Sequence, residues 1–190
     1  MISGKNEILE KDTLNRFLDT ALSEKKLTIK NTNFNRIEKT AFEHVPPQEV
    51  EYLFLNNNLI DSIEMGAFSP LTSLKKLVLS YNCLNFVENK LFENLSNLEE
   101  LEITNNEIKL IYPQAFHGLV KLRRLILANN KLENIYPDTF SGLKELDLLV
   151  LSQNSNIFEF FCCSSKENRS KAFPAFMIAL YFFSVILSFT

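Results

Sequence analysis

Apolar residues recur along most of the chain in a short leucine pattern that ends on an asparagine. Three aliphatic residues precede each asparagine at fixed spacings, as Leu74, Leu77 and Leu79 precede Asn82. The arrangement repeats every 24 residues, and its asparagines are Asn58, Asn82, Asn106, Asn130 and Asn154. Five copies in one register indicate a structural repeat.

The second half of each repeat is equally regular. An aliphatic residue is followed five positions later by a phenylalanine. The aliphatic column is Ile37, Ile63, Val87, Ile111 and Ile135, and the phenylalanine column is Phe42, Phe68, Phe92, Phe116 and Phe140. An earlier copy, with Leu27, Ile29 and Phe34 in the strand positions and Thr32 in place of the asparagine, brings the total to about six units.

This pattern predicts a stack of coils. Alternating leucines predict a short strand whose leucines face inward, and successive strands should pair in parallel at about 4.8 Å. The repeated asparagine should form a buried ladder of hydrogen bonds to backbone groups at the turn. The preceding residue, such as Asn105, is expected on the surface with little effect on stability. The phenylalanines should form a second apolar spine, with Phe116 more buried than Tyr112.

The motif L-x-x-L-x-L-x-x-N over residues 27–154 resembles the leucine-rich repeat family. Its 24-residue period resembles the extracellular type found in Toll-like receptors and insect cell-surface adhesion proteins. The resemblance implies an α/β fold: a curved horseshoe-shaped solenoid with a parallel sheet on its concave face. It also implies a non-catalytic module that binds a protein ligand, of the cell-surface recognition, adhesion or receptor type.

Three further segments flank the repeats, one before them and two after them. Residues 1–26 carry apolar residues at helical spacing, which predicts an amphipathic helix over the first coil or a degenerate leading repeat. Residues 155–171 are expected to form a C-terminal cap and juxtamembrane linker. Residues 172–190 carry no charge and predict a hydrophobic helix that serves as a membrane anchor or a lipid-anchor signal.

The location of the solenoid depends on how that tail is used. A lipid anchor attached near Cys163 would place it outside the cell, whereas a retained tail anchor would make it a cytosolic scaffold on an organelle membrane. Asn94 and Asn168 stand in N-glycosylation motifs, which favours the cell surface. In a third interpretation, the chain is a fragment of a longer receptor ectodomain.

The amino-acid composition limits the kinds of function that this chain can have. The net charge of -3 gives no basic footprint for nucleic acid. Only 2 His and 3 Cys are present, and no glycine-rich phosphate loop occurs, so we expect no enzyme activity, metal or cofactor.

Candidate binding residues lie at strand positions that the core does not need. Aromatic residues and arginine contribute most often to the energy of protein interfaces. The predicted partner-binding residues on the concave face are Tyr52, Phe54, Val78, Tyr81, Glu102, Arg124 and Ile126. A neighbouring column alternates in sign through Lys25, Glu51, Lys75, Glu99, Arg123 and Asp147, and we interpret it as a solvated charge ladder.

Overall fold

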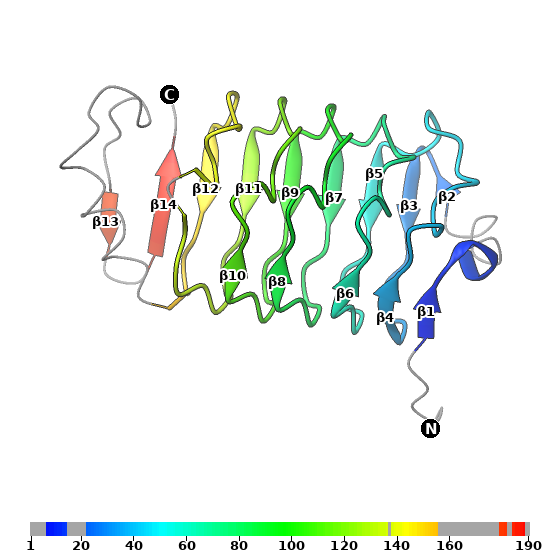
Figure 1. The fold of residues 1–190 in the computed structure, drawn as a ribbon, viewed down its shortest axis with the longest axis horizontal. Coiled ribbons are helices and arrows are strands. Elements are labelled where there is room, and N and C mark those ends of the chain that lie inside the picture. The colour runs from blue at the N-terminus through cyan, green and yellow to red at the C-terminus, as the bar shows by residue number, and fades with distance from the viewer. Residues whose placement is uncertain (1–6, 15–21, 137, 156–178, 182–183, 189–190) are drawn as a thin grey trace.

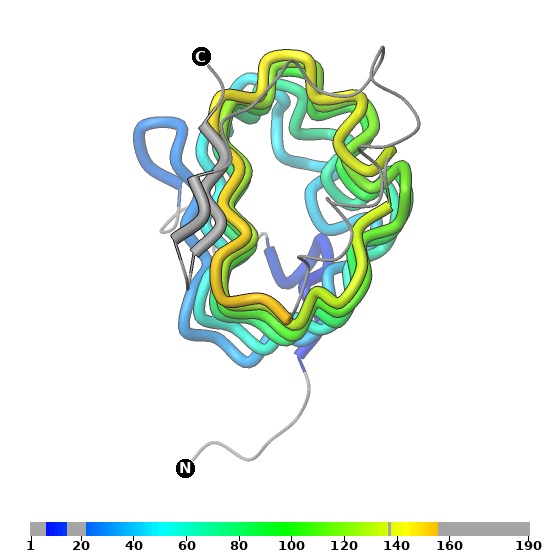
Figure 2. Tube along the Cα trace, turned by 90° about the vertical axis from the view of Figure 1, so that its left-hand side faces the viewer, coloured from blue at the N-terminus to red at the C-terminus, as the bar shows by residue number. Residues whose placement is uncertain are grey.

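The chain winds into a stack of similar coils. The computed structural model describes residues 7–14, 22–136, 138–155, 179–181 and 184–188. Figure 1 shows the coils following one another along the long axis, and Figure 2, seen along the stack, shows them superposed around a shared interior. The leucine, aliphatic and phenylalanine columns fill that interior as one continuous core. The predicted solenoid of about six turns is confirmed.

One side of the stack is a long sheet. Its strands β3 to β12 pair in parallel and in register, and the leucine at the centre of each strand is buried. The parallel strands are β3 (Lys26–Thr28), β5 (Tyr52–Phe54), β7 (Lys76–Val78), β9 (Glu100–Glu102), β11 (Arg124–Ile126) and β12 (Leu148–Val150). A single central leucine per strand faces the core because successive side chains point to opposite faces.

The opposite side carries turns and small strands of two to four residues. The small strands are β4 (Phe34–Ile37), β6 (Ser62–Ile63), β8 (Phe86–Val87) and β10 (Leu110–Ile111). In the part of the chain that the structure describes, only residues 11–14 are helical. The predicted leucine-rich-repeat solenoid with its parallel sheet is therefore present, and in the described residues it contains little helix. The central leucines of successive coils are 24 residues apart after Leu53, and the chain between each small strand and the next sheet strand forms turns.

Each ladder asparagine joins two coils. The Nδ2 group of Asn106 donates to the carbonyl of Leu79 in the preceding coil at 3.0 Å, and its Oδ1 atom accepts from the Leu84 amide at 3.0 Å. Asn82, Asn130 and Asn154 make equivalent bonds, and their amide groups also donate to the carbonyl three residues earlier. The predicted structural ladder is confirmed.

The residue before each ladder asparagine has a left-handed backbone. The column is Asn31, Asn57, Tyr81, Asn105, Asn129 and Gln153, with φ between 53° and 59°. Asparagine tolerates this conformation better than most residues, which explains why four of the six positions carry it. The expectation that Asn105 has little structural effect is wrong, because alanine there would carry a penalty of roughly 1–2 kcal/mol.

The phenylalanine column forms a stacked spine. Phe116 is 2% exposed, and its ring centroid lies 6.2 Å from that of Phe92 and 5.9 Å from that of Phe140. Tyr112, four residues earlier, is 40% exposed. The predicted order of burial is confirmed.

The N-terminal segment adds a partial coil. Strand β1 (Glu7–Leu9) pairs in parallel with β4, with Leu9 opposite Ile37, so Leu9 takes the aliphatic position as a degenerate repeat would. Residues 11–14 form one helical turn, and β2 (Leu22–Ser23) pairs antiparallel with β3. Because the described residues Glu7–Leu9 and Leu22–Ser23 are strands, a single amphipathic helix does not run through all of residues 1–26.

The C-terminal segment contains strands where a helix was expected. Strand β14 (Ser184–Ser188) pairs antiparallel with β12 and with β13 (Ala179–Tyr181), and Figure 1 shows it beside β12 at the end of the sheet. The helix prediction is wrong at these residues because the edge of β12 offers unpaired backbone groups that an apolar strand can satisfy. Among the residues placed in the structure, no helix is long and apolar enough to span a bilayer. The linker 156–171 and Asn168 lie outside the described residues.

The asparagine ladder predicts a specific loss of stability. Asn106→Ala removes bonds to two coils and leaves buried backbone groups unpaired, so the free energy of unfolding should fall by about 1–3 kcal/mol in a denaturant titration. Asn105→Gly is the control, since glycine keeps a φ of 53° without strain and should change stability by less than about 1 kcal/mol. Equal losses in the two variants would contradict the ladder.

The phenylalanine spine predicts a larger loss. Phe116→Ala removes a stacked, buried ring and leaves a cavity, so the free energy of unfolding should fall by about 3–5 kcal/mol in a denaturant titration. Tyr112→Ala, an exposed aromatic in the same coil, is the matched control and should lie within about 1 kcal/mol of the parent. A comparable cost for Tyr112→Ala would show that the spine is not the dominant packing element.

Candidate functional site on the large sheet

The residues predicted to bind a partner gather on the outer face of the large sheet. Strand register aligns Phe54, Val78, Glu102 and Ile126 in one row. The adjacent row contains Tyr52 and Arg124. Tyr81 follows β7 by three residues, so the whole set belongs to four neighbouring coils.

Two tyrosines are the most accessible aromatic members of the set. The side chain of Tyr52 is 38% exposed and that of Tyr81 is 56% exposed. Tyr81 also has a φ of 59°, where bulky residues are uncommon. A large aromatic side chain is thus held in solvent at a backbone position that favours asparagine.

Phe54 is half-buried and partly shielded by a cation. The Nζ atom of Lys26 lies 4.7 Å from the centroid of the Phe54 ring, within cation–π range. Ile126 is also half-buried. These two side chains offer an apolar surface that is only partly open to a partner.

Val78 does not belong to the accessible surface. Its side chain is 6% exposed, so its assignment as a contact residue is wrong. Val78 lies in register between Phe54 and Glu102, and Lys76 on the same strand bonds to Glu102. These larger neighbours shield the small valine, an effect that its position in the repeat does not reveal.

The charged members of the set are already paired. Glu102 accepts a hydrogen bond from Lys76 at 2.6 Å, and Glu100 lies 3.3 Å from Lys76 Nζ and 3.1 Å from Arg124 Nε. Burial acts to lower the pKa of Lys76, but the bonds and charges of Glu102 and Glu100 outweigh it and raise that pKa. The centre of the face therefore carries a preorganised network of opposite charges.

The alternating charge column is confirmed at its N-terminal end. Glu51 bridges Lys25 at 2.6 Å and Lys75 at 2.7 Å. The hydrogen bond from Lys25, followed by that from Lys75, lowers the pKa of Glu51. Further along the column Arg123 pairs with Glu145, 3.5 Å away, instead of with a member of the column.

Sequence reasoning missed two features of the accessible surface. The contact between Lys26 and Phe54 runs diagonally from strand β3 to strand β5. Both residues stand in neighbouring columns of the repeat, so the repeat alignment already contained the pair. Exposed aromatics also lie on the side of the small strands, where Phe86, Tyr112 and Tyr136 are 40–44% exposed. Phe86 directly precedes the aliphatic column and Tyr112 and Tyr136 directly follow it, and these positions give the only sequence signal of that surface.

Asn94 is accessible for modification. It is exposed, with a φ of 78°, and its Nδ2 group donates to Ser69 Oγ at 3.3 Å. In the described part of the chain, no group of three His, Cys, Asp or Glu side chains is placed to hold a metal ion.

The comparisons with known proteins agree with the repeat geometry. A family model described as leucine rich repeat matches residues 25–84, 72–132 and 121–157, which together span most of the chain. The chain belongs to the leucine-rich repeat family. A search of curated protein sequences finds no match.

Solved structures similar to this leucine-rich repeat chain include two receptor complexes. One is the Toll–Spatzle complex of Drosophila in glycosylated form, with 27% identity, a TM-score of 0.59, and coverage of 65% of this chain and 18% of the other. The other is a TLR13–ssRNA13 complex, with 24% identity, a TM-score of 0.52, and coverage of 78% and 23%. This chain therefore spans about a fifth of either chain, and the second likeness bears on the fold alone.

Proposed function

We propose that this leucine-rich repeat chain is a non-catalytic module that recognises a protein through the exposed face of its large sheet. The observation that carries the proposal is Tyr81, an exposed aromatic at a backbone position where four other coils have asparagine. Residues held in sparsely populated backbone conformations cluster at functional sites. Tyr81 is therefore the residue we place at the centre of the interface.

The surroundings of Tyr81 suit a protein partner. Tyr52 is exposed and Phe54 half-buried in the preceding coil, and both supply apolar area with little conformational entropy to lose. Lys76, Glu100, Glu102 and Arg124 are already fixed by ion pairs, so they can define orientation without being ordered on binding.

The charge pattern favours a protein over a nucleic acid. Lys76 and Arg124 are each paired with a carboxylate, and the chain has a net charge of -3. Binding a polyphosphate would require unpaired cations along the face. The Toll–Spatzle complex, a structure with 27% identity to this chain, supports recognition of a protein ligand by a related solenoid.

The proposal predicts that replacing Tyr81 raises the stability of the fold while it weakens binding of the partner. Tyr81→Asn, combined with Tyr52→Ser, removes both exposed tyrosines, and the Tyr81→Asn change should raise stability by about 1 kcal/mol by relieving the left-handed strain. A photo-crosslinking residue placed at Tyr81 in the full chain should capture a protein in native extract, and the double variant should lose that protein in co-purification. Denaturant titration gives the stability of each variant.

A matched pair of tyrosines provides the control. Tyr112 and Tyr136 are 40% and 43% exposed on the other side of the stack. Tyr112→Ser with Tyr136→Ser should leave co-purification of the captured protein unchanged. If the Tyr112 and Tyr136 variant abolishes capture and the Tyr52 and Tyr81 variant does not, the proposed binding face is wrong. If the crosslinker at position 81 captures RNA instead of a protein, the proposed class of partner is wrong.

The proposal extends to a location on the outside of the cell or at its membrane. The repeat length, the exposed Asn94 motif and the similarity to Toll support it. A cytosolic scaffold on an organelle membrane and a fragment of a longer receptor ectodomain are the alternatives. Because residues 179–181 and 184–188 are strands, the proposal does not depend on a membrane-spanning helix there.

Glycosylation of Asn94 tests the location. In protein isolated from its native source, we expect an N-linked glycan on Asn94, detected as a mass shift that a glycosidase removes. Ser96→Ala eliminates the motif without changing Asn94 or its φ of 78°, so it should abolish the shift and keep the fold. An unmodified Asn94 in membrane-associated native protein would favour the cytosolic face.

A further inference from the structure

The ladder of small strands is interrupted between the coils of β6 and β8. Strand β6 pairs with β4 and β8 pairs with β10, but β6 and β8 do not pair with each other. The amides of Asp61 and Glu64 donate to the preceding coil, at 2.8 Å to Asn35 and 2.9 Å to Ile37. Among the residues the structure describes, the equivalent amides of Asn85 and Glu88 make no such bond.

A large residue at the spine explains the interruption. Directly before each spine phenylalanine, the other coils carry small residues: Ala41, Ala67, Ala115 and Thr139. The coil of β8 has Leu91 there, 4% exposed, and the preceding Lys90 has a φ of 58°. Because cores are close-packed, the added volume displaces the backbone of this coil.

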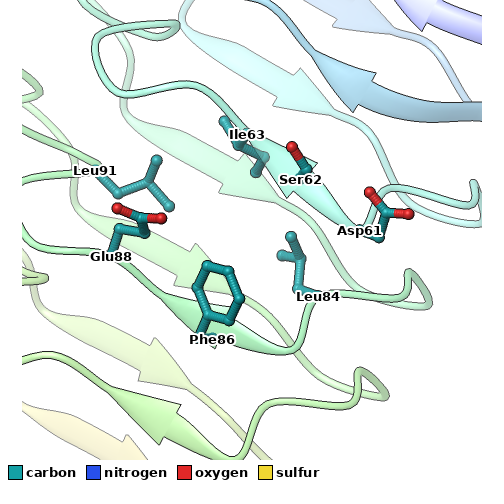
Figure 3. A pocket seen from close by; sticks show the side chains of 7 residues that line it. All are labelled: Asp61, Ser62, Ile63, Leu84, Phe86, Glu88 and Leu91. Carbon is teal, nitrogen blue, oxygen red and sulfur yellow. The ribbon is translucent and has the colours of Figure 1, made fainter.

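A cleft opens where the two strands separate. It holds about 60 Å³ and is lined by Ile63, Leu84, Phe86 and Leu91, with the carboxylates of Asp61 and Glu88 at its ends, as Figure 3 shows. Ile63 is only half-buried, although Ile37, Val87 and Ile111 in the same column are 0–1% exposed. The cleft therefore has an apolar floor and an acidic rim.

We infer that this cleft binds the side chain of a lysine presented by a partner, or an equivalent primary alkylammonium. A buried water needs about 10–15 Å³ by this measure, so 60 Å³ holds roughly four to six small atoms. The butylammonium group of lysine has five heavy atoms, whereas the longer side chain of arginine exceeds the space. An aliphatic stem suits Ile63, Leu84 and Leu91, and the charged end suits a carboxylate.

Glu88 is the carboxylate placed to receive the ammonium. Within the described residues the side chain of Glu88 has no ion pair or hydrogen bond, whereas the charge of Asp61 acts on Arg36. Phe86 in β8, two residues before Glu88, is 44% exposed and lines the same cleft in Figure 3. A cation at Glu88 can therefore also contact the aromatic ring. This site lies on the small-strand side and is independent of the face proposed to bind a protein.

The test uses n-butylammonium and the full chain. In a titration followed by amide NMR, the resonances of Ile63, Phe86 and Glu88 should shift and saturate, with a dissociation constant on the order of millimolar for so small a ligand. Neutral n-butanol, of equal size, should bind at least about tenfold more weakly. Equal binding of the two probes, or no saturable shift, would overturn the inference.

Charge variants locate the ammonium. Glu88→Gln should weaken n-butylammonium binding about tenfold or more, and Asp61→Asn should weaken it less. Glu133→Gln is the matched control, because Glu133 occupies in a later coil the position of Asp61 and lies outside the cleft. Undiminished binding by Glu88→Gln would overturn the assignment.

The origin of the cleft is tested by restoring the usual residue. Leu91→Ala should let the coils close, so n-butylammonium binding is lost and the amides of Asn85 and Glu88 gain protection from hydrogen exchange. Its melting temperature should fall less than that of Leu95→Ala, a fully buried leucine in the same coil. Persistent binding in a folded Leu91→Ala variant would show that Leu91 does not create the site.

Discussion

The fold depends on one interaction, the hydrogen bonding of a buried asparagine amide to two successive coils. Asn82, for example, donates to the carbonyls of Leu55 and Leu79 and accepts from the amide of Ile60. Parallel strands of three residues leave many backbone groups unpaired at the turn, and water cannot reach them. The asparagine satisfies these groups with both ends of one side chain, which fixes the distance and register between coils.

That constraint determines which positions remain free for function. To direct the asparagine inward, the preceding residue takes a left-handed backbone, so that column consists mainly of asparagine. Tyr81 breaks this preference, and an aromatic ring is thereby held in solvent beside Tyr52. The strain is local and the ladder on either side tolerates it, because each coil is held by its neighbours. A recognition surface can thus be added without changing the core.

The opposite side of the stack shows the consequence of a core substitution. Leu91 is accommodated because the large sheet and the spine, with Phe92 stacked between Phe68 and Phe116, keep the coils together. The displacement is taken up by the small strands, where β6 and β8 separate and expose part of Ile63. Repeat proteins distribute stability over many similar interfaces, so one interface can open and form a cleft.

The sequence by itself determined the repeat, the inward leucines, the asparagine ladder and the phenylalanine spine. Each follows from a fixed spacing that only one stacking register satisfies, as the burial of Leu77, Asn82 and Phe116 shows. The sequence also placed the candidate binding residues on one face of the sheet, because the fixed repeat length sets the register between neighbouring strands.

Only the tertiary structure decided the features that depend on neighbouring coils. Val78 is buried because residues 24 positions away cover it, and the left-handed φ at Asn105 and Tyr81 follows from the turn around the ladder. The strands at 179–181 and 184–188 replace the expected helix because the edge of β12 supplies backbone partners. An apolar sequence can satisfy its backbone in a helix or in a sheet, and the partner available in space decides between them.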